Sequence, residues 1–279
     1  MRSANLIVVI LGIAGVATAA AIAWRWRSLP LLADLRPAVE TRGAAAIDGL
    51  HTLAVAMAAG LIAGILVPGL GGRLVMRILG ATSSDAQGVR TDADQLVGEI
   101  TSSGTIELLI FVGVLGGVIA ALAFLVVRRW LPTTAGPAGM VGGVLLLGTI
   151  GVSDAMSPDN TDFAVLGPTW LALSLVVALA LLFGVTFTAL AARLDAGIPN
   201  LVARPSSIAS HGALVIFLLI PPLLVGAVVY VTGWAVSRGR LRPLLTGTTS
   251  LRIGHAIVAI ATIFATVTSI QAISEIISA

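Results

Sequence analysis

Apolar residues along this chain fall into long segments that are separated by shorter polar linkers. Stretches of about 20 apolar residues cross a bilayer as α-helices, because lipid offers backbone amides no hydrogen-bond partners. The longest polar linkers, 24–51 and 72–105, are too short for a second core, which predicts a single domain over residues 1–279. The pattern predicts an all-α polytopic transmembrane bundle with seven membrane-embedded segments, at about 5–23, 52–71, 106–127, 138–153, 169–191, 212–235 and 254–274.

Composition supports a membrane environment. Of 279 residues, 57% are hydrophobic and 10% are charged, and the mean hydropathy is +1.06. A soluble domain has roughly a quarter charged residues, so polar groups cannot cover this surface. The chain is therefore expected in a bilayer, as a multi-pass membrane protein.

The tryptophans all fall at segment ends, where amphipathic rings rest at headgroup depth. They are Trp24, Trp26, Trp130, Trp170 and Trp234. The N-terminal segment has the features of a signal peptide with a site at Ala17-Thr18-Ala19, but its long apolar run and the following "WRWR" favour a retained anchor.

Arginine placement predicts orientation, because cytoplasmic linkers collect positive charge. The linkers after the first, third and fifth segments contain arginine, which places the N-terminus outside. Seven simple crossings nevertheless divide the 16 arginines equally between the two sides. The equality disappears if the short fourth segment or the sixth, interrupted by Pro221-Pro222, enters and leaves on one side, so sidedness stays open.

Several chemistries are excluded by composition. The chain has no cysteine, which rules out disulfides and thiolate metal sites. All 16 basic residues are arginine, so no lysine can form a Schiff base. The net charge is only +3 and the arginines form no stripe, so no nucleic-acid partner is expected. No cofactor and no metal are predicted.

Glycines recur four residues apart in three apolar segments, as Gly60 and Gly64, Gly113 and Gly117, and Gly139 and Gly143. Such small residues let helix backbones approach closely in lipid. Packing within the bundle and a homo-oligomeric interface are both consistent with the pattern.

One polar candidate site follows the second segment. Arg73 and Arg77 are four residues apart and share a face on a continuing helix, while Glu99 and Glu107 precede the third segment. Guanidinium groups suit both carboxylates and phosphates. The pattern therefore fits either a salt bridge that closes a hairpin or a site for an anion or a lipid phosphate.

An acidic stretch, "SDAMSPDNTDF", contributes Asp154, Asp159, Asn160 and Asp162 to the same predicted side. Asp and Asn commonly cap helices and close turns. Contact with the arginine hairpin is the second interpretation, and a Ca²⁺ site is the third.

Histidines stand just before three apolar segments, at His51, His211 and His255. A shared metal or haem site requires all three on one side. We interpret them as interfacial residues without a special role.

The motifs "GGRLVMRIL" and "SPDNTDF…GPTW" resemble those of a family of uncharacterised bacterial polytopic integral membrane proteins. The resemblance covers about residues 50–279. It implies an inner-membrane location and no particular chemistry.

The leading hypothesis is a non-enzymatic accessory or assembly partner of membrane components. Its partners would be membrane lipids, other membrane subunits or a second copy of the chain. One alternative is a small transporter or channel with a polar mouth at Arg73, Arg77, Glu99, Glu107 and the Asp159–Asp162 loop. Another is a membrane enzyme that acts on lipid headgroups with these carboxylates.

Overall fold

The computed structural model describes residues 2–31, 42–83, 102–157, 167–198 and 248–278. Within these ranges every regular element is helical, and an isolated β-bridge joins Pro30 to Thr134. The elements in chain order are α1 (Arg2–Trp26), α2 (Arg42–Gly64), η1 (Ile65–Gly71), α3 (Gly72–Thr82), α4 (Ser102–Glu107), η2 (Leu108–Leu115), α5 (Gly116–Val127), η3 (Arg128–Trp130), α6 (Ala135–Leu146), η4 (Leu147–Ala155), α8 (Thr169–Gly197) and α12 (Thr248–Ser278).

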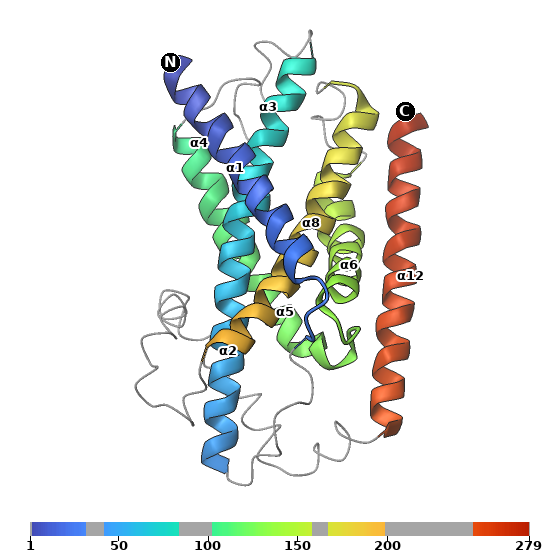
Figure 1. Cartoon of the computed structure of the whole chain (residues 1–279). Helices are drawn as coiled ribbons and strands as arrows, with labels where there is room; N and C mark the ends of the chain where they lie inside the picture. The colour runs from blue at the N-terminus through green and yellow to red at the C-terminus, as the bar shows by residue number, and fades with distance from the viewer. Residues whose placement is uncertain (1, 32–41, 84–101, 158–166, 199–247, 279) are drawn as a thin grey trace.

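These elements join into long helices that stand side by side (Figure 1). Six of them are long and apolar enough to cross a membrane, which matches six of the seven predicted segments. The predicted segment 212–235 lies outside the described residues. The six helices are Leu6–Trp26, His51–Thr82, Ser103–Trp130, Ala135–Ser153, Thr169–Gly197 and Thr248–Ser278.

The second helix is longer than predicted, because it begins at Arg42 and continues to Thr82. The predicted segment 52–71 is therefore the apolar part of a longer helix, and residues 42–51 and 72–82 of the polar linkers are helical as well. The continuation is amphipathic: Val75 and Leu79 pack against α8, and the helical spacing places Arg73 and Arg77 on a different face. One apolar stripe is enough to keep this stretch helical.

The bundle has two polar ends. The end of α1 meets the start of α6, where the Gly136 amide donates to the Arg27 carbonyl at 2.7 Å, and Trp130 packs against Gly254 at the start of α12. We call this the arginine-rich end. At the opposite end, Gly167 lies against Ser83, where α3 ends and α8 begins.

The fourth helix runs from one end to the other. Gly136 lies beside Arg27 at the arginine-rich end, Gly148 packs on Ala265 of α12, and Met156 belongs to a buried cluster near the C-terminus of α12. A re-entrant fourth segment therefore does not agree with the described structure.

The described arginines are distributed unequally between the two ends. Helix α8 ends at Gly197, and α12 begins at Thr248. Both of these helix ends lie at the arginine-rich end (Figure 1). The equal division of arginines belonged to the topology with seven simple crossings, in which the start of the last segment lies at the other end. Arg25, Arg27, Arg42, Arg128, Arg129, Arg193 and Arg252 belong to the arginine-rich end, and Arg2, Arg73 and Arg77 to the opposite half.

Backbone contacts between glycines join the second and third helices. A side chain on Gly60 would collide with the Gly117 carbonyl, one on Gly64 with the Gly113 carbonyl, and one on Gly117 with the Gly60 carbonyl. Glycine is required at these positions because only a residue without a Cβ lets two helix backbones approach this closely. The predicted small-residue pairs therefore pack within the bundle.

The same type of contact joins the fourth and fifth helices. Gly139 lies on Val185 and Gly184, and Gly143 lies on Ala180 and Leu181. The Thr188 hydroxyl of α8 also donates to the Ala135 carbonyl of α6 at 2.7 Å. A polar bond between helices of this kind contributes about 1 kcal/mol in an apolar surrounding.

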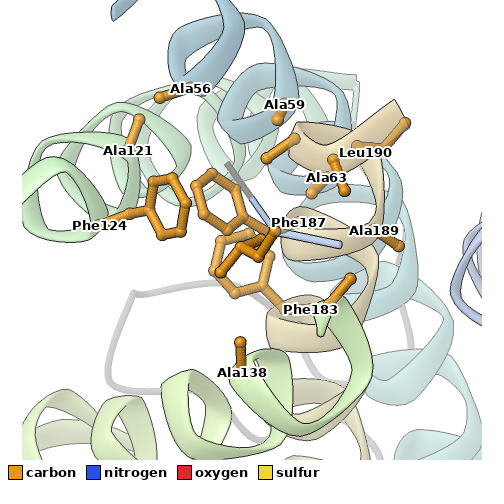
Figure 2. Packing of buried hydrophobic residues seen from close by; sticks show 14 of the residues in the cluster. Ala56, Ala59, Ala63, Ala121, Phe124, Ala138, Phe183, Phe187, Ala189 and Leu190 are labelled. Atoms are coloured by element: carbon orange, nitrogen blue, oxygen red, sulfur yellow. The ribbon is translucent and has the colours of Figure 1, made fainter. Parts of the chain in front are cut away.

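Aromatic side chains fill the centre of the bundle. Phe124 of α5 meets Phe187 of α8 edge to face, with ring centroids 5.1 Å apart, and Phe183 stacks on Phe187 at 6.2 Å (Figure 2). Alanines from α2, α5 and α6 surround these rings and leave room for them. They are Ala56, Ala59, Ala63, Ala121 and Ala138.

The second helix is locally π-helical over η1, and Pro68 explains why. Proline has no amide hydrogen, so the Gly64 carbonyl loses its ordinary α-helical partner. The third and fourth helices have similar stretches, η2 and η4. The π-helical η1 packs directly on η2, since Gly69 contacts Leu109 and Gly113 contacts Ile65.

Replacing Gly117 with alanine is expected to lower the free energy of unfolding by about 1–3 kcal/mol, because the added methyl group meets a backbone carbonyl that cannot move aside. Gly116→Ala is the matched control, since a Cβ there meets nothing within 4 Å. It should leave stability unchanged or raise it by up to about 1 kcal/mol. Denaturant unfolding in micelles measures both, and equal effects would contradict the close backbone contact.

Candidate functional site

The first candidate site lies where the second and third helices meet in the opposite half of the bundle. Arg73 and Arg77 are one turn apart on α3, as predicted, and Glu107 is the last residue of α4. The backbones are close here, because a Cβ on Gly72 would lie 3.4 Å from Leu108 Cδ2. The guanidinium of Arg73 is within electrostatic range of the Glu107 carboxylate.

The Arg73 side chain is incompletely satisfied. It is half-buried, and its Nε is enclosed by protein without a hydrogen-bond partner. A buried donor without an acceptor costs about 1–3 kcal/mol, and more when the group is charged. Glu107 itself is exposed, so its carboxylate offsets this cost only in part.

Arg73 also lies deep along the bundle. Gly71 contacts Leu179, and Val75 packs near Leu175, so Arg73 is level with the α8 turn between those two leucines. With a rise of about 1.5 Å per residue, that turn lies roughly 10 Å along α8 from Trp170. Trp170 is 65% exposed at the start of α8. Arg73 is therefore level with an apolar turn of α8, whereas Glu107 is exposed at the end of α4.

The other predicted members of this site are only partly placed. Asp154 belongs to η4, which reaches the opposite end, but its side chain is not described. Glu99, Asp159, Asn160 and Asp162 lie outside the described residues. The structure thus brings together Arg73 and Glu107, with Arg77 one turn further along the same helix.

A second polar pair occurs at the arginine-rich end and was not predicted. His51 is 1% exposed, and its Nε2 lies 3.2 Å from Oδ1 of Asp195 near the end of α8. An ionised carboxylate only accepts hydrogen bonds, so the histidine donates from Nε2. Nearby, the Arg193 guanidinium lies 5.7 Å from the centre of the Trp26 ring.

His51 is thus a buried residue whose side chain joins α2 to α8, a structural contact that the interpretation from the sequence did not include. Sequence spacing gave one usable signal, since His51 and Asp195 both border segments on the same predicted side. Which histidine pairs with which carboxylate depends on helix contacts that spacing does not contain.

The three histidines do not form a described metal site. His51 is buried against Asp195, His255 is exposed on the first turns of α12, and His211 is outside the described residues. In the part of the chain that the structure describes, no three His, Cys, Asp or Glu side chains lie close enough to hold a metal ion.

Comparison with known proteins gives no further assignment. No protein-family model, no curated protein and no solved structure matches this chain. The resemblance to a family of bacterial membrane proteins therefore stays a prediction, and function is inferred from the residues of this chain.

A double-mutant cycle on His51→Ala and Asp195→Ala is expected to give a coupling energy of about 1–2 kcal/mol, because each single change leaves a polar partner behind in the bundle. Unfolding in micelles provides the four stabilities. His255→Ala removes an exposed histidine and should change stability by less than about 0.5 kcal/mol. Additive single changes at His51 and Asp195 would exclude a stabilising bond.

Proposed function

We propose that this chain is a multi-pass protein of a bacterial cytoplasmic membrane, with its arginine-rich end in the cytoplasm and its N-terminus outside. Six long apolar helices support insertion. Large apolar side chains also point outward from the bundle, among them Phe111, Ile260 and Phe264, each more than half exposed. Water would penalise such a surface, whereas lipid does not. The excess of arginine at one end supports the orientation.

Within the membrane, we propose a non-enzymatic role as an accessory or assembly partner of other membrane components. The observation that carries this proposal is the packed centre of the bundle. A transporter needs a polar path through the membrane, but Phe124, Phe183 and Phe187 fill the space between the described helices from the middle of α8 toward the arginine-rich end. Helices packed in this way are suited to holding a partner in position.

Among the described helices, α12 offers an accessible surface for such a partner. Its described contacts lie on one side, through Gly254, Ala265 and Ile273, and the helix stands at the edge of the bundle (Figure 1). A face of large apolar side chains runs along the rest of it, and includes Ile253, Ile257, Ile260, Ile263, Phe264, Val267 and Ile270.

A small transporter remains the second candidate, and one observation favours it. In the charged pair of Arg73 and Glu107, Arg73 is level with an apolar turn of α8, where ionisable groups commonly mark ion or substrate paths. A path through this pair would have to pass beside the packed phenylalanines, which makes it the weaker proposal.

Cysteine labelling tests insertion and orientation, because the natural chain contains no cysteine. Single variants Ser28→Cys and Thr249→Cys lie at the arginine-rich end, and Ser103→Cys lies at the opposite end; all three positions are exposed. On intact cells, an impermeant maleimide should label only Ser103→Cys. The first two should react after the cytoplasmic side is opened.

Ile260→Cys is the control for lipid exposure, since it is 66% exposed at the middle of α12. It should resist the reagent on both sides while the membrane is intact. Rapid labelling of this variant would exclude insertion, and a reversed pattern at the two ends would exclude the proposed orientation.

Replacing Ile257, Ile260 and Phe264 of α12 with alanine is expected to reduce co-purification of a membrane partner at least about tenfold, since buried aromatic and aliphatic anchors dominate such interfaces. Alanine keeps the helix apolar, so insertion should persist. Quantitative mass spectrometry after purification in mild detergent measures the loss.

The matched control replaces Ile110, Ile119 and Val126 on the third helix, which are also exposed. That variant should retain the partner. A wild-type chain that purifies without any stoichiometric protein, or equal loss in both variants, would contradict the accessory role at α12.

A further inference from the structure

We propose that Arg73 and Arg77 form an oxyanion-binding site that takes the phosphate group of an anionic phospholipid. The site lies in the opposite half of the bundle, between α3 and the start of the third helix. It is separate from the α12 surface and does not depend on the accessory role.

The need for a ligand follows from the state of Arg73. A guanidinium has five donors in a planar fork, and a buried charge is stable only when its donors are matched. The enclosed Nε of Arg73 lacks an acceptor and is covered by protein, so a ligand would reach the guanidinium through the exposed part of this half-buried side chain. The carboxylate of Glu107 contributes its charge from an exposed position. Phosphate oxygens are suitable acceptors, because arginine binds them through paired, charge-assisted hydrogen bonds.

The position of the site favours a lipid over a dissolved anion. Arg73 lies roughly 10 Å along the bundle from the turn that bears the exposed Trp170. A dissolved phosphate would lose its hydration on the way to that depth. A lipid phosphate already lies in the headgroup layer beside this end of the bundle, and part of Arg73 is exposed.

The spacing of the two arginines suits a single phosphate. Arg73 and Arg77 are one helical turn apart, and neighbouring side chains at this spacing have Cβ atoms about 5–6 Å apart. Two arginine side chains at this spacing can each reach a different oxygen of one phosphate. The π-helical stretch η1 ends just before Arg73, and η2 begins just after Glu107. Such π-helical turns are frequent at functional sites.

Glu107 gives the proposal a distinctive consequence. Its negative charge stabilises the arginine in the unliganded protein but repels an incoming anion. Removing that charge should therefore tighten phosphate binding. If the Arg73–Glu107 pair served only to join two helices, the same change would weaken the bundle and improve no binding.

Native mass spectrometry of the full chain in mild detergent provides the test, with phosphatidylglycerol as the probe and phosphatidylcholine for comparison. Arg73→Gln is expected to weaken phosphatidylglycerol binding about tenfold, the loss of one charge-assisted interaction. Glu107→Gln should tighten it several-fold. Arg129→Gln, which removes an exposed arginine at the arginine-rich end, should leave the affinity unchanged.

Inorganic phosphate distinguishes the two sources of the anion. If millimolar phosphate displaces phosphatidylglycerol from the wild-type chain, a free anion also fits the site. If it does not, the site is specific for the lipid.

Unchanged phosphatidylglycerol binding in Arg73→Gln, or weaker binding in Glu107→Gln, would overturn the proposal. Should Arg73→Gln fail to fold, Arg73→Lys keeps the charge and removes the planar fork. It should show an intermediate loss of affinity, and undiminished binding in that variant would also overturn the assignment.

Discussion

Close contact between helix backbones is the interaction on which the rest of this structure depends. In a bilayer, helices gain little from the hydrophobic effect by associating, so packing distance determines how strongly they hold together. The Gly60, Gly64, Gly113 and Gly117 contacts bring the second and third helices to backbone distance, and Gly139, Gly143 and Gly184 do the same for the fourth and fifth. At such distances Cα–H groups can also approach carbonyl oxygens.

The second helix pairs closely with the third, and the fourth pairs closely with the fifth. Large aromatic rings fill the space between these two helix pairs. Phe124 and Phe187 project from helices of different pairs and meet at the centre. Around these rings the described polar side chains are hydrogen-bonded threonines such as Thr188, and the charged groups lie outside this cluster. The result is one end with His51, Asp195 and most of the described arginines, and an opposite half with Arg73 and Glu107.

Much of the fold was predictable from the sequence, because hydropathy, tryptophans and glycine spacing are local signals. The shared face of Arg73 and Arg77 follows from helical geometry alone. The full length of the second helix was not predicted, because hydropathy gives only the bounds of its apolar part, and the amphipathic α3 lies beyond them. The His51–Asp195 bond and the pairing of particular glycines join distant parts of the chain, and no local pattern contains that information.

Solid-state NMR of a glycine-labelled chain in lipid bilayers tests the central claim most directly. The account predicts a through-space correlation between Gly64 and Gly113, since a Cβ built on Gly113 would lie 3.1 Å from the Gly64 carbonyl oxygen. Observing it in a bilayer would support both insertion and backbone-distance packing. A well-ordered sample in which the two assigned glycines show no correlation would contradict the account.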